Sequence, residues 1–533
     1  MVYLSTESNV YKYVTRKGNA VADRRLTLAY VSVEMMIPEL GDEACTANFR
    51  GGLGDLAGHT IEGLVKSGIN VVPITFFYTT NWQTGKSVDY TKTPAMRHPH
   101  RLDVEIHWKK ESTPIWTINR AGATVFGLSH PSNRILYPGD KYEKLDQAAF
   151  LGRAVPALLR HLQITPDILW CQEWMTALCI PNMRDDSYFA NCKSVFTVHT
   201  AARGALENFL VDVYDRMAID RRWYDHFVVG NSIRPTEGGV KCADKVTGVS
   251  KQFGELCQMI FSDDAHKIHG IMNGTSRDFF LSPHVKRYRE EPNMLQLQVA
   301  HDEDKRELLS VIEAKTGVRF DPRKLLLGAV RRLADYKNQL PMFAPIIDQV
   351  FASRPHGYDA QVFLAGVAHE NDPERLQWME EFRMWMQREG LKNRFVYIPE
   401  YSERLRTLAA RGCDLWVSCP WEAHEACGTS DYVAKINGNP NLATCGGGIM
   451  EHGREFDPVT RQGDTLFITP YSSETMGIKI GWVSRMYYNY IEHNDDRWPT
   501  LRMNNHIGGK KLDVTHMIRR YNEECFANLV GFL

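Results

Sequence analysis

The sequence predicts an α/β protein built on two doubly wound parallel sheets. Short apolar segments typical of buried strands alternate with segments of helical period along most of the chain. Glycine-rich loops follow several of these strands, as expected where a parallel strand leads into a helix. A charged, mostly helical stretch over 285–322 separates two such series. The length agrees with two domains, because 533 residues exceed what one hydrophobic core usually supports.

These boundaries predict how the chain is divided. We expect an N-terminal Rossmann-like domain over 1–300, with a β-rich insertion near 83–135. A second Rossmann-like domain should cover 301–500. Residues 501–533 are expected to be helices that pack back on the N-terminal domain. Two facing sheets would place the best ligand site in the cleft between them.

The first series opens with LTLAYVSVEMM (26–36), which is typical of a buried strand. The loop NFRGGLGDLAG (48–58) follows, then a helical segment and the strand INVVPITFFY (69–78). Glycines in this loop allow a ligand to approach the backbone closely. On local sequence alone the loop could equally be a tight turn.

Further along this series, VFTVHT (195–200) predicts a strand that ends near His199. The carboxyl ends of strands are where open α/β sheets bind ligands, although an isolated histidine is more often structural. The segment IHGIMNG (268–274) ends another strand, with Asn273 at a turn.

The second series begins with the apolar strand LLLGAV (325–330), and VRRLADYKNQ follows it with Arg332 and Lys337. An arginine fork and a lysine charge suit phosphate oxygens. A solvated basic helix start explains this pair equally well on local sequence alone.

The segment PWEAHEACGTSDYVAKINGNP (420–440) contains a loop with Glu425 and then a short helix. Gly428 and Thr429 suit the helix entry, and a second glycine run follows at 446–448. Such a helix start directs N–H groups at an anion, with a carboxylate beside it.

Composition excludes several classes of protein. The net charge of −1 argues against nucleic acid as the main partner. No segment approaches the roughly twenty apolar residues of a membrane span, and the first residues do not form a signal peptide. The eleven cysteines are scattered, which favours reduced thiols and a cytoplasmic location. The sequence does not indicate the oligomeric state, and a homo-oligomer is one possibility.

Together these motifs resemble GT-B glycosyltransferases of the α-glucan phosphorylase and glycogen/starch synthase group. The similar segments span most of the chain in matching order, and they are AYVSVEM (29–35), FRGGLGDLAG (49–58), ILYPGDKYEKLDQAAF (135–150), FTVHT (196–200), GIMNG (270–274), VRRLADYKNQ (330–339) and EACGTSDYVAKING (425–438). The resemblance implies a GT-B fold, with acceptor binding by the N-terminal domain and donor binding by the C-terminal domain.

The resemblance also implies roles for individual residues. His199 would bond the transferred sugar, while Arg332 and Lys337 would bind the leaving phosphate. Glu425 would accept hydrogen bonds from donor hydroxyls. The remaining donor and phosphate contacts are expected at Gly52, Leu53, Gly54, Gly428 and Thr429, and Asn273 matches a motif position without an assigned role.

One departure from the phosphorylases decides the expected activity. They hold pyridoxal phosphate on a lysine where this chain has Val433, which cannot form a Schiff base. Lys435 is two residues, or about 200°, further around the helix. We therefore expect no required cofactor, and a nucleotide sugar as co-substrate. Glu173 is a second departure, because the synthases tend to have an aspartate there.

The expected function is retaining transfer of a sugar, first of all glucose, from a nucleotide-diphosphate sugar to a glucan or other glycan. The alternatives are a phosphorylase that works without pyridoxal phosphate and a non-catalytic glycan-binding relative. No metal site is expected, since the chain lacks a convincing DxD pair and His98 and His100 have no partner at zinc-like spacing.

Overall fold

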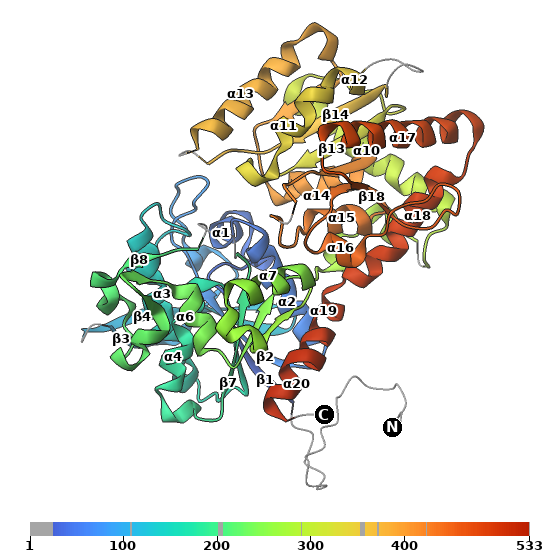
Figure 1. Cartoon of the computed structure of the whole chain (residues 1–533). Helices are drawn as coiled ribbons and strands as arrows, with labels where there is room; N and C mark the ends of the chain where they lie inside the picture. Colours follow the sequence, from blue (N-terminus) through green and yellow to red (C-terminus); the bar gives the residue numbers. More distant parts are fainter. Residues whose placement is uncertain are drawn as a thin grey trace, which may run out of the picture. The chain divides into compact units, whose positions relative to one another are not determined.

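The computed structural model describes residues 25–106, 109–200, 206–288, 290–351, 358–369, 372–422 and 424–531. The chain forms two compact units (Figure 1). Unit 1 contains the residues up to Thr275 and those from Val514 onward, and unit 2 is Ser276–Asp513. The sequence predicts this division near residue 300. It falls earlier because 276–316 contributes apolar side chains to the cores of unit 2.

Unit 1 is built on one nine-stranded sheet of order β12-β11-β7-β6-β1-β2-β5-β4-β3. Its strands are β1 (Thr27–Val31), β2 (Asn70–Phe76), β3 (Met96–Ile106), β4 (Lys109–Arg120), β5 (Ala123–Leu128), β6 (Ile168–Gln172), β7 (Lys193–Val198), β11 (Lys245–Gly248) and β12 (Ile268–Gly270). In this sheet order, every pair of neighbouring strands from β12 to β5 is parallel. The antiparallel strands β3, β4 and β5 form the β-rich insertion. A small sheet contains β8 (Phe209–Leu210), β9 (Val228–Val229) and β10 (Ser232–Ile233).

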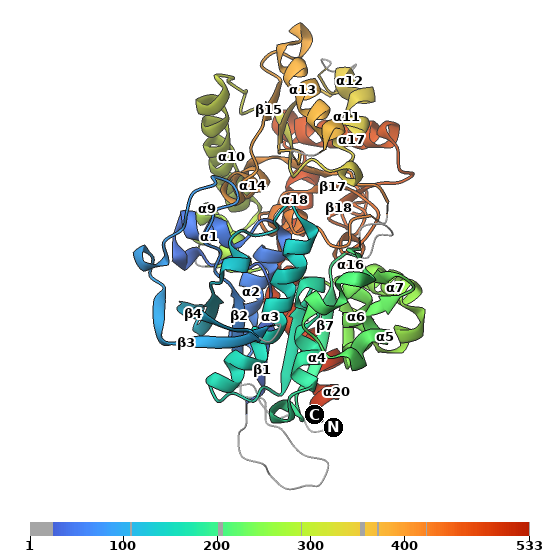
Figure 2. The ribbon, with the colours of Figure 1, turned by 90° about the vertical axis from the view of Figure 1, so that its left-hand side faces the viewer.

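The helices of unit 1 are α1 (Asp42–Asn48), α2 (Gly52–Lys66), α3 (Lys141–His161), α4 (Cys179–Arg184), α5 (Tyr224–Phe227), α6 (Pro235–Cys242), α7 (Lys251–Ile260), α19 (Val514–Tyr521) and α20 (Ala527–Val530). Helices α3 and α4 lie side by side (Figure 2), and a Cβ on Gly152 would come within 2.8 Å of Leu178 Cβ. The C-terminal helix α19, red in Figure 1, packs on α2. Val514, Ile518 and Tyr521 are buried in the same core as the first strand.

Unit 2 is built on a six-stranded parallel sheet of order β15-β14-β13-β16-β17-β18. Its strands are β13 (Leu325–Val330), β14 (Ala360–Ala365), β15 (Phe395–Ile398), β16 (Leu415–Ser418), β17 (Asn441–Thr444) and β18 (Thr465–Ile468). Its helices are α8 (Arg277–Phe280), α9 (Pro283–Lys286), α10 (Met294–Thr316), α11 (Gln339–Phe343), α12 (Ile347–Phe351), α13 (Pro373–Gln387), α14 (Glu403–Gly412), α15 (Ser430–Ile436), α16 (Ile449–His452), α17 (Ser473–His493) and α18 (Arg497–Gly509). Most residues of these strands are completely buried, as their continuous apolar runs predicted.

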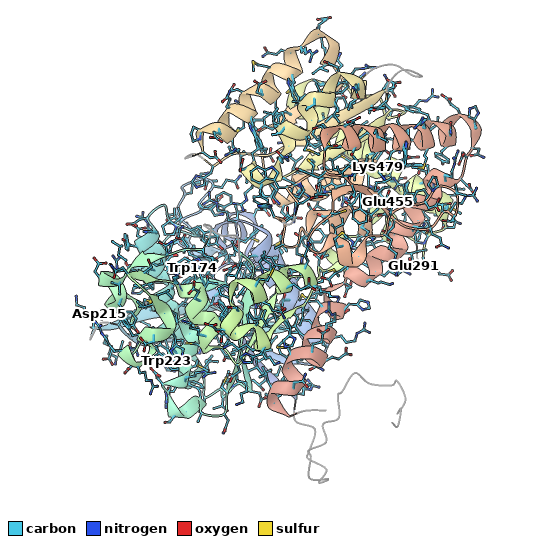
Figure 3. The ribbon with its side chains drawn as sticks, in the orientation of Figure 1. Trp174, Asp215, Trp223, Glu291, Glu455 and Lys479 are labelled. Atoms are coloured by element: carbon cyan, nitrogen blue, oxygen red, sulfur yellow. The ribbon has the colours of Figure 1, made fainter. Side chains whose placement is uncertain are left out.

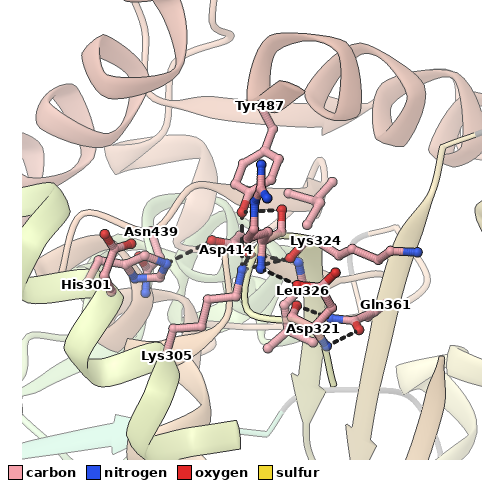
Figure 4. A network of polar contacts seen from close by, with 12 residues as sticks. His301, Lys305, Asp321, Lys324, Leu326, Gln361, Asp414, Asn439 and Tyr487 are labelled. Carbon is pink, nitrogen blue, oxygen red and sulfur yellow. Dashed lines mark hydrogen bonds and ion pairs between the residues drawn. The ribbon is translucent and has the colours of Figure 1, made fainter. Parts of the chain in front are cut away.

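A buried ionic network ties helix α10 to the middle of this sheet (Figure 4). Asp414, just before β16, accepts hydrogen bonds from His301 Nε2 at 2.9 Å, Lys305 Nζ at 2.6 Å and the Leu326 amide at 2.7 Å. Burial acts to raise the pKa of Asp414, but the Lys305 ammonium and the His301 hydrogen bond outweigh it. The pKa is therefore held well below its usual range.

Two parallel, doubly wound sheets confirm the predicted fold class. Counted among its parallel strands, the unit 2 sheet has the order 3-2-1-4-5-6, and the unit 1 sheet has the same order with a seventh strand, β12, added after the sixth. Sheets of this order bind ligands where the strand order reverses. In unit 1 this point lies between β1 and β6, and in unit 2 between β13 and β16. Among the described residues, no helix has both the length and the apolar character needed to cross a membrane.

Candidate active site

The strand ends at the switch point of unit 2 bring two predicted site residues together. Strands β13 and β16 pair in parallel at Leu327 and Leu415, so the loops that follow them start side by side. The Trp421 amide then donates a 2.8 Å hydrogen bond to the Tyr336 carbonyl and joins the two loops. As a result, Lys337 Nζ donates directly to Glu425 Oε2, across 88 residues of sequence.

Glu425 lies in a positive environment. Arg331 Nη1 is 3.4 Å from the same Oε2 that Lys337 contacts. Burial acts to raise the pKa of Glu425, but Lys337, Arg331 and, more weakly, Arg332 outweigh it and lower the pKa. The carboxylate therefore stays ionised and can accept hydrogen bonds from ligand hydroxyls.

The two adjacent arginines take opposite positions. Arg331 is 5% exposed, and its Nη2 donates to Ser418 Oγ at 2.6 Å and to Ser430 Oγ at 3.1 Å. Arg332, the residue assigned to phosphate from the sequence, is exposed and forms no ion pair with another described residue. Arg331 therefore builds the site, while the charge of Arg332 is available to a ligand.

A glycine pair fixes the backbone beside Glu425. Gly447 has a φ of +60°, and a Cβ there would lie 2.1 Å from the Glu425 carbonyl oxygen. A Cβ on Gly448 would lie 2.5 Å from Cys427 Sγ. Only glycine allows this approach.

The backbone at the start of α15 offers donors next to Glu425. The amides of Gly428 and Thr429 donate no hydrogen bond to any other residue that the structure describes. Asp431, in the first turn, forms an ion pair with Arg331 at 3.4 Å, and burial raises its pKa. The short helix thus starts with two available N–H groups beside a buried Arg–Asp pair.

Val433 of the same helix faces the core. Its side chain is completely buried in a cluster with Phe363 and Trp416. Lys435 points elsewhere, because its Nζ lies 2.7 Å from Asp464 Oδ2 and also donates to the His452 carbonyl. Valine has no amine, and the Lys435 amine is held by these two contacts.

The switch point of unit 1 contains a second set of site residues. Helix α2 starts at Gly52, and the amides of Gly52 and Leu53 donate to no other described residue. Glu34, just after β1, accepts hydrogen bonds from the Arg50 amide at 2.8 Å and the Gly51 amide at 3.2 Å. Gly54 must be glycine, because a Cβ there would lie 2.4 Å from Phe49 Cβ.

His199 follows strand β7 and is held by the end of β6. Its amide donates to Glu173 Oε1 at 2.8 Å, and its Nε2 lies 2.9 Å from Gln172 Oε1. Burial lowers the pKa of His199 to about 3. The ring is therefore neutral near pH 7. Glu173 has a φ of +63°, a strained value for a non-glycine residue, and burial raises its pKa.

Glu173 also lines a cavity of about 210 Å³ inside unit 1. Trp174, labelled in Figure 3, and Tyr137 contribute aromatic surface, and Glu207 contributes a second carboxylate. Tyr137 donates to Glu34 Oε1 at 2.7 Å, which connects the cavity wall to the loop before α2. An aromatic wall with carboxylate acceptors suits a polar, ring-shaped ligand such as a sugar.

Asn273 stands apart from these groups. It is 5% exposed, and its amide donates to the Val249 carbonyl at 3.1 Å. A Cβ on the next residue, Gly274, would lie 2.8 Å from Val514 Cα. These contacts place Asn273 at the packing of the C-terminal helix.

Three site residues were missed by the sequence reasoning: Glu34, Gln172 and Arg331. Glu34 lies near the carboxyl end of the segment LTLAYVSVEMM (26–36), and Gln172 is the last residue of strand β6, next to Glu173. A polar residue at the carboxyl end of a predicted strand is therefore a sequence signal for a site residue. No local signal separates Arg331 from Arg332, because the difference depends on burial against residues about ninety positions away.

Comparisons with known proteins show which chains this one is similar to. Residues 42–272 match the family described as the starch synthase catalytic domain. A glycogen synthase of Lachnospira eligens is 22% identical over 461 residues, which cover 83% of this chain and 90% of that protein. A glycogen synthase of Clostridium beijerinckii is 20% identical over 466 residues, covering 83% and 88%. A glycogen phosphorylase of Mycobacterium tuberculosis is 22% identical over 524 residues, covering 78% and 60%.

The fold has a counterpart among solved structures. The catalytic domain of starch synthase IV from Arabidopsis thaliana, bound to ADP and acarbose, matches 95% of this chain and all of that chain, with a TM-score of 0.76. At 18% identity the likeness establishes the fold. Together the comparisons confirm the resemblance that the sequence motifs predicted.

Proposed function

We propose that this chain, a GT-B relative of the starch and glycogen synthases, is a retaining glycosyltransferase that moves glucose from a nucleotide-diphosphate sugar to a glucan. The observation that carries the proposal is the Lys337–Glu425 pair, with Arg332 beside it, at the switch point of unit 2. A cationic pair suits the departing phosphate, and an ionised carboxylate suits donor hydroxyls.

Unit 2 binds the donor. Arg332 and Lys337 stabilise the negative charge that grows on the leaving phosphate, and the Gly428 and Thr429 amides add hydrogen bonds. Glu425 accepts hydrogen bonds from hydroxyls of the sugar or of the ribose. Buried Arg331 does not touch the donor but holds Glu425 and Asp431 in place.

Unit 1 supplies the acceptor side and contacts to the transferred sugar. His199 bonds the sugar near its reacting centre, and the Gly52, Leu53 and Gly54 backbone lies against the donor phosphate. The cavity beside Glu173 and Trp174 receives the acceptor glycan. An oxygen of the departing donor phosphate accepts the proton of the acceptor hydroxyl, and that hydroxyl attacks the sugar from the face that the phosphate leaves. The anomeric carbon therefore keeps its configuration without a protein nucleophile.

The enzyme works without pyridoxal phosphate. The packing of Val433 in the core and the ion pair of Lys435 support this. A nucleotide sugar is the only co-substrate required. We also propose a cytoplasmic location, on the basis of the scattered cysteines.

A donor–acceptor assay tests the proposal. Glucose esters of UDP, ADP and GDP are offered with a maltooligosaccharide, and chain growth is followed by chromatography. At least one donor should support growth, and Lys337→Ala should lower turnover about a hundredfold to a thousandfold without unfolding the protein. Absence of growth with every donor, or normal turnover in Lys337→Ala, would refute the transferase.

The glycogen phosphorylase relatives favour one second candidate, a phosphorylase independent of pyridoxal phosphate. It predicts release of glucose 1-phosphate from maltooligosaccharide and inorganic phosphate. The same chromatographic assay, run with phosphate in place of a nucleotide sugar, separates the two activities.

A further inference from the structure

Three histidines of unit 1 meet at the outer edge of its sheet, away from the switch point. His98 and His100 lie on β3, the last strand in the sheet order, and His161 is the final residue of α3. The ring centroid of His161 lies 5.6 Å from that of His98 and 5.8 Å from that of His100. The two rings on the strand are 5.8 Å apart. The three imidazoles therefore form a nearly equilateral triangle.

An irregularity in β3 brings two of these rings to the same place. The pairing with β4 shifts register between Arg97 and Arg101, so that three residues of β3 lie opposite one residue of β4. His98, Pro99 and His100 are these three residues. A bulge of this kind changes the direction of the side chains that it carries. Strand β3 also packs against α3, which brings the end of that helix to the bulge.

The backbone beside His98 orients its ring. Its Nδ1 lies 3.4 Å from the His100 carbonyl oxygen and 3.3 Å from the His100 amide nitrogen. A proton on Nδ1 can be donated to this carbonyl, which leaves Nε2 with a lone pair for a ligand. Metal-binding histidines almost always donate their other N–H to a carboxylate, a backbone carbonyl or water. Among the described residues, no carboxylate forms an ion pair with any of the three rings.

The end of α3 favours a cation at this point. The last carbonyl groups of a helix carry partial negative charge, and His161 is the last residue of a 21-residue helix. The neighbouring charge of Arg160 is already balanced, because its Nε donates to Asp186 Oδ2 at 3.2 Å. The Arg160 guanidinium also lies over the ring of Tyr188, 4.6 Å from its centroid. The local field therefore suits a positive ion among the three rings.

We propose that His98, His100 and His161 bind a divalent transition-metal ion, with Zn²⁺ the best match. Zinc takes imidazole nitrogen at about 2.0–2.1 Å in a tetrahedron, and three protein ligands leave the fourth position to water. Such a site sets the ring centroids about 5.2 Å apart. The observed 5.6 and 5.8 Å require a contraction of roughly half an ångström, with rotation of each ring to turn one nitrogen toward the ion. Mg²⁺ and Ca²⁺ prefer oxygen ligands and fit less well.

The ion would act as a clip between the β-rich insertion and α3. Strand β3 is the outer strand of the sheet and pairs with β4 on one side. Binding of one ion by β3 and α3 would therefore fasten a strand that the sheet holds from one side. The sequence predicts no metal site at His98 and His100, because the third ligand lies on a different element far along the chain. The site does not depend on the proposed transferase activity.

Calorimetric titration of the chelator-treated, tag-free full chain with ZnCl₂ tests the site. The wild type should bind one more equivalent of Zn²⁺ than His100→Ala and His161→Ala do, and Mg²⁺ should not compete. Zn²⁺ should also raise the unfolding temperature of the wild type more than that of either variant. The matched control is His493→Ala at the end of α17, whose side chain is 71% exposed. It should bind like the wild type.

Both test positions are exposed, so neither substitution should unfold the protein, and circular dichroism without metal checks this. Co²⁺ offers a second measurement, because a tetrahedral site with nitrogen ligands gives visible absorption bands that should be absent in His161→Ala. Equal Zn²⁺ stoichiometry in the wild type and in folded His100→Ala or His161→Ala would overturn the proposal. So would the absence of Zn²⁺ binding to the wild type, or loss of the same equivalent in His493→Ala.

Discussion

At the scale of single residues, Arg331 and Arg332 show how one step along the chain changes a role. Both follow strand β13 and carry the same charge. Backbone alternation turns one side chain into the protein and the other toward solvent. Arg331 neutralises buried carboxylates, and Arg332 offers its charge to a ligand.

The first prediction contrasts these two arginines. Arg331→Ala should lower the free energy of unfolding by about 3–5 kcal/mol, because it leaves a buried carboxylate without its partner. Arg332→Ala should change stability by less than about 0.5 kcal/mol but reduce turnover about a hundredfold or more. Urea unfolding and steady-state kinetics measure the two effects. Similar losses of stability in both variants would contradict these roles.

A second prediction concerns His199, whose neutral ring is 2.9 Å from Gln172. The unfolded chain takes up a proton at this histidine near its ordinary pKa, whereas the folded protein takes it up only near pH 3. This group therefore lowers stability as the pH falls below about 6.5. Gln172→Glu places a carboxylate beside the ring, so it should raise the pKa of His199.

The pH–rate profile between pH 5 and 8 measures this change. The wild type should show no ionisation of His199 in that range, whereas Gln172→Glu should gain a new acidic limb. Gln172→Leu is the neutral control and should keep the wild-type profile shape. An unchanged profile in Gln172→Glu would argue against the proposed contact.

At the scale of elements, the loop after β17 packs so closely against Glu425 that position 447 must be glycine. Gly447 combines a positive φ with a carbonyl oxygen 2.1 Å from the position of its missing Cβ. This loop can therefore pack against the backbone of Glu425 only while position 447 has no side chain. The third prediction follows from this packing.

Gly447→Ala should destabilise the protein by about 1–3 kcal/mol through backbone strain and displacement of the Glu425 loop. It should also raise the KM for the nucleotide sugar. Gly390→Ala is the control, because no atom lies within 4 Å of its added Cβ. Thermal unfolding and initial rates compare the two. A wild-type KM in Gly447→Ala would show that the loop does not shape the donor site.

The elements also show what the sequence could predict. The parallel sheets could be predicted from the sequence, because buried parallel strands are continuous apolar segments, as in LLLGAV (325–330), and several of them lead into glycine-rich loops. The contact between Lys337 and Glu425 arises because each lies in a loop that follows a strand next to the switch point. The burial of Arg331 and the strained backbone of Glu173 depend on distant segments. No local pattern encodes them.

At the scale of the whole molecule, unit 1 is assembled from both ends of the chain. Helix α19 fills the face of α2, where a Cβ on Gly63 would lie 2.9 Å from Ile518 Cγ1. Residues 514–531 are therefore part of the unit 1 core. This agrees with the expected packing of the last helices on the N-terminal domain, while 501–513 belong to unit 2.

The fourth prediction tests this contribution. Ile518→Ala should cost about 2–5 kcal/mol, because a fully buried side chain leaves a cavity in unit 1. Arg519→Ala, on the exposed side of the same helix, should cost less than about 0.5 kcal/mol. Calorimetry of the full chain should show a lower unfolding temperature only for the first. Equal temperatures for both variants would exclude a core role for α19.

The same discontinuity affects how the protein is made. A ribosome releases the sheet of unit 1 long before it releases α19, because residues 276–513 must be translated in between. At about 5–20 residues per second this delay lasts on the order of tens of seconds. Throughout it, the nascent sheet exposes the apolar surface that Ile518 and Tyr521 later cover. Unit 2, whose residues all precede Val514, can therefore complete its fold before unit 1, although unit 1 is synthesised first.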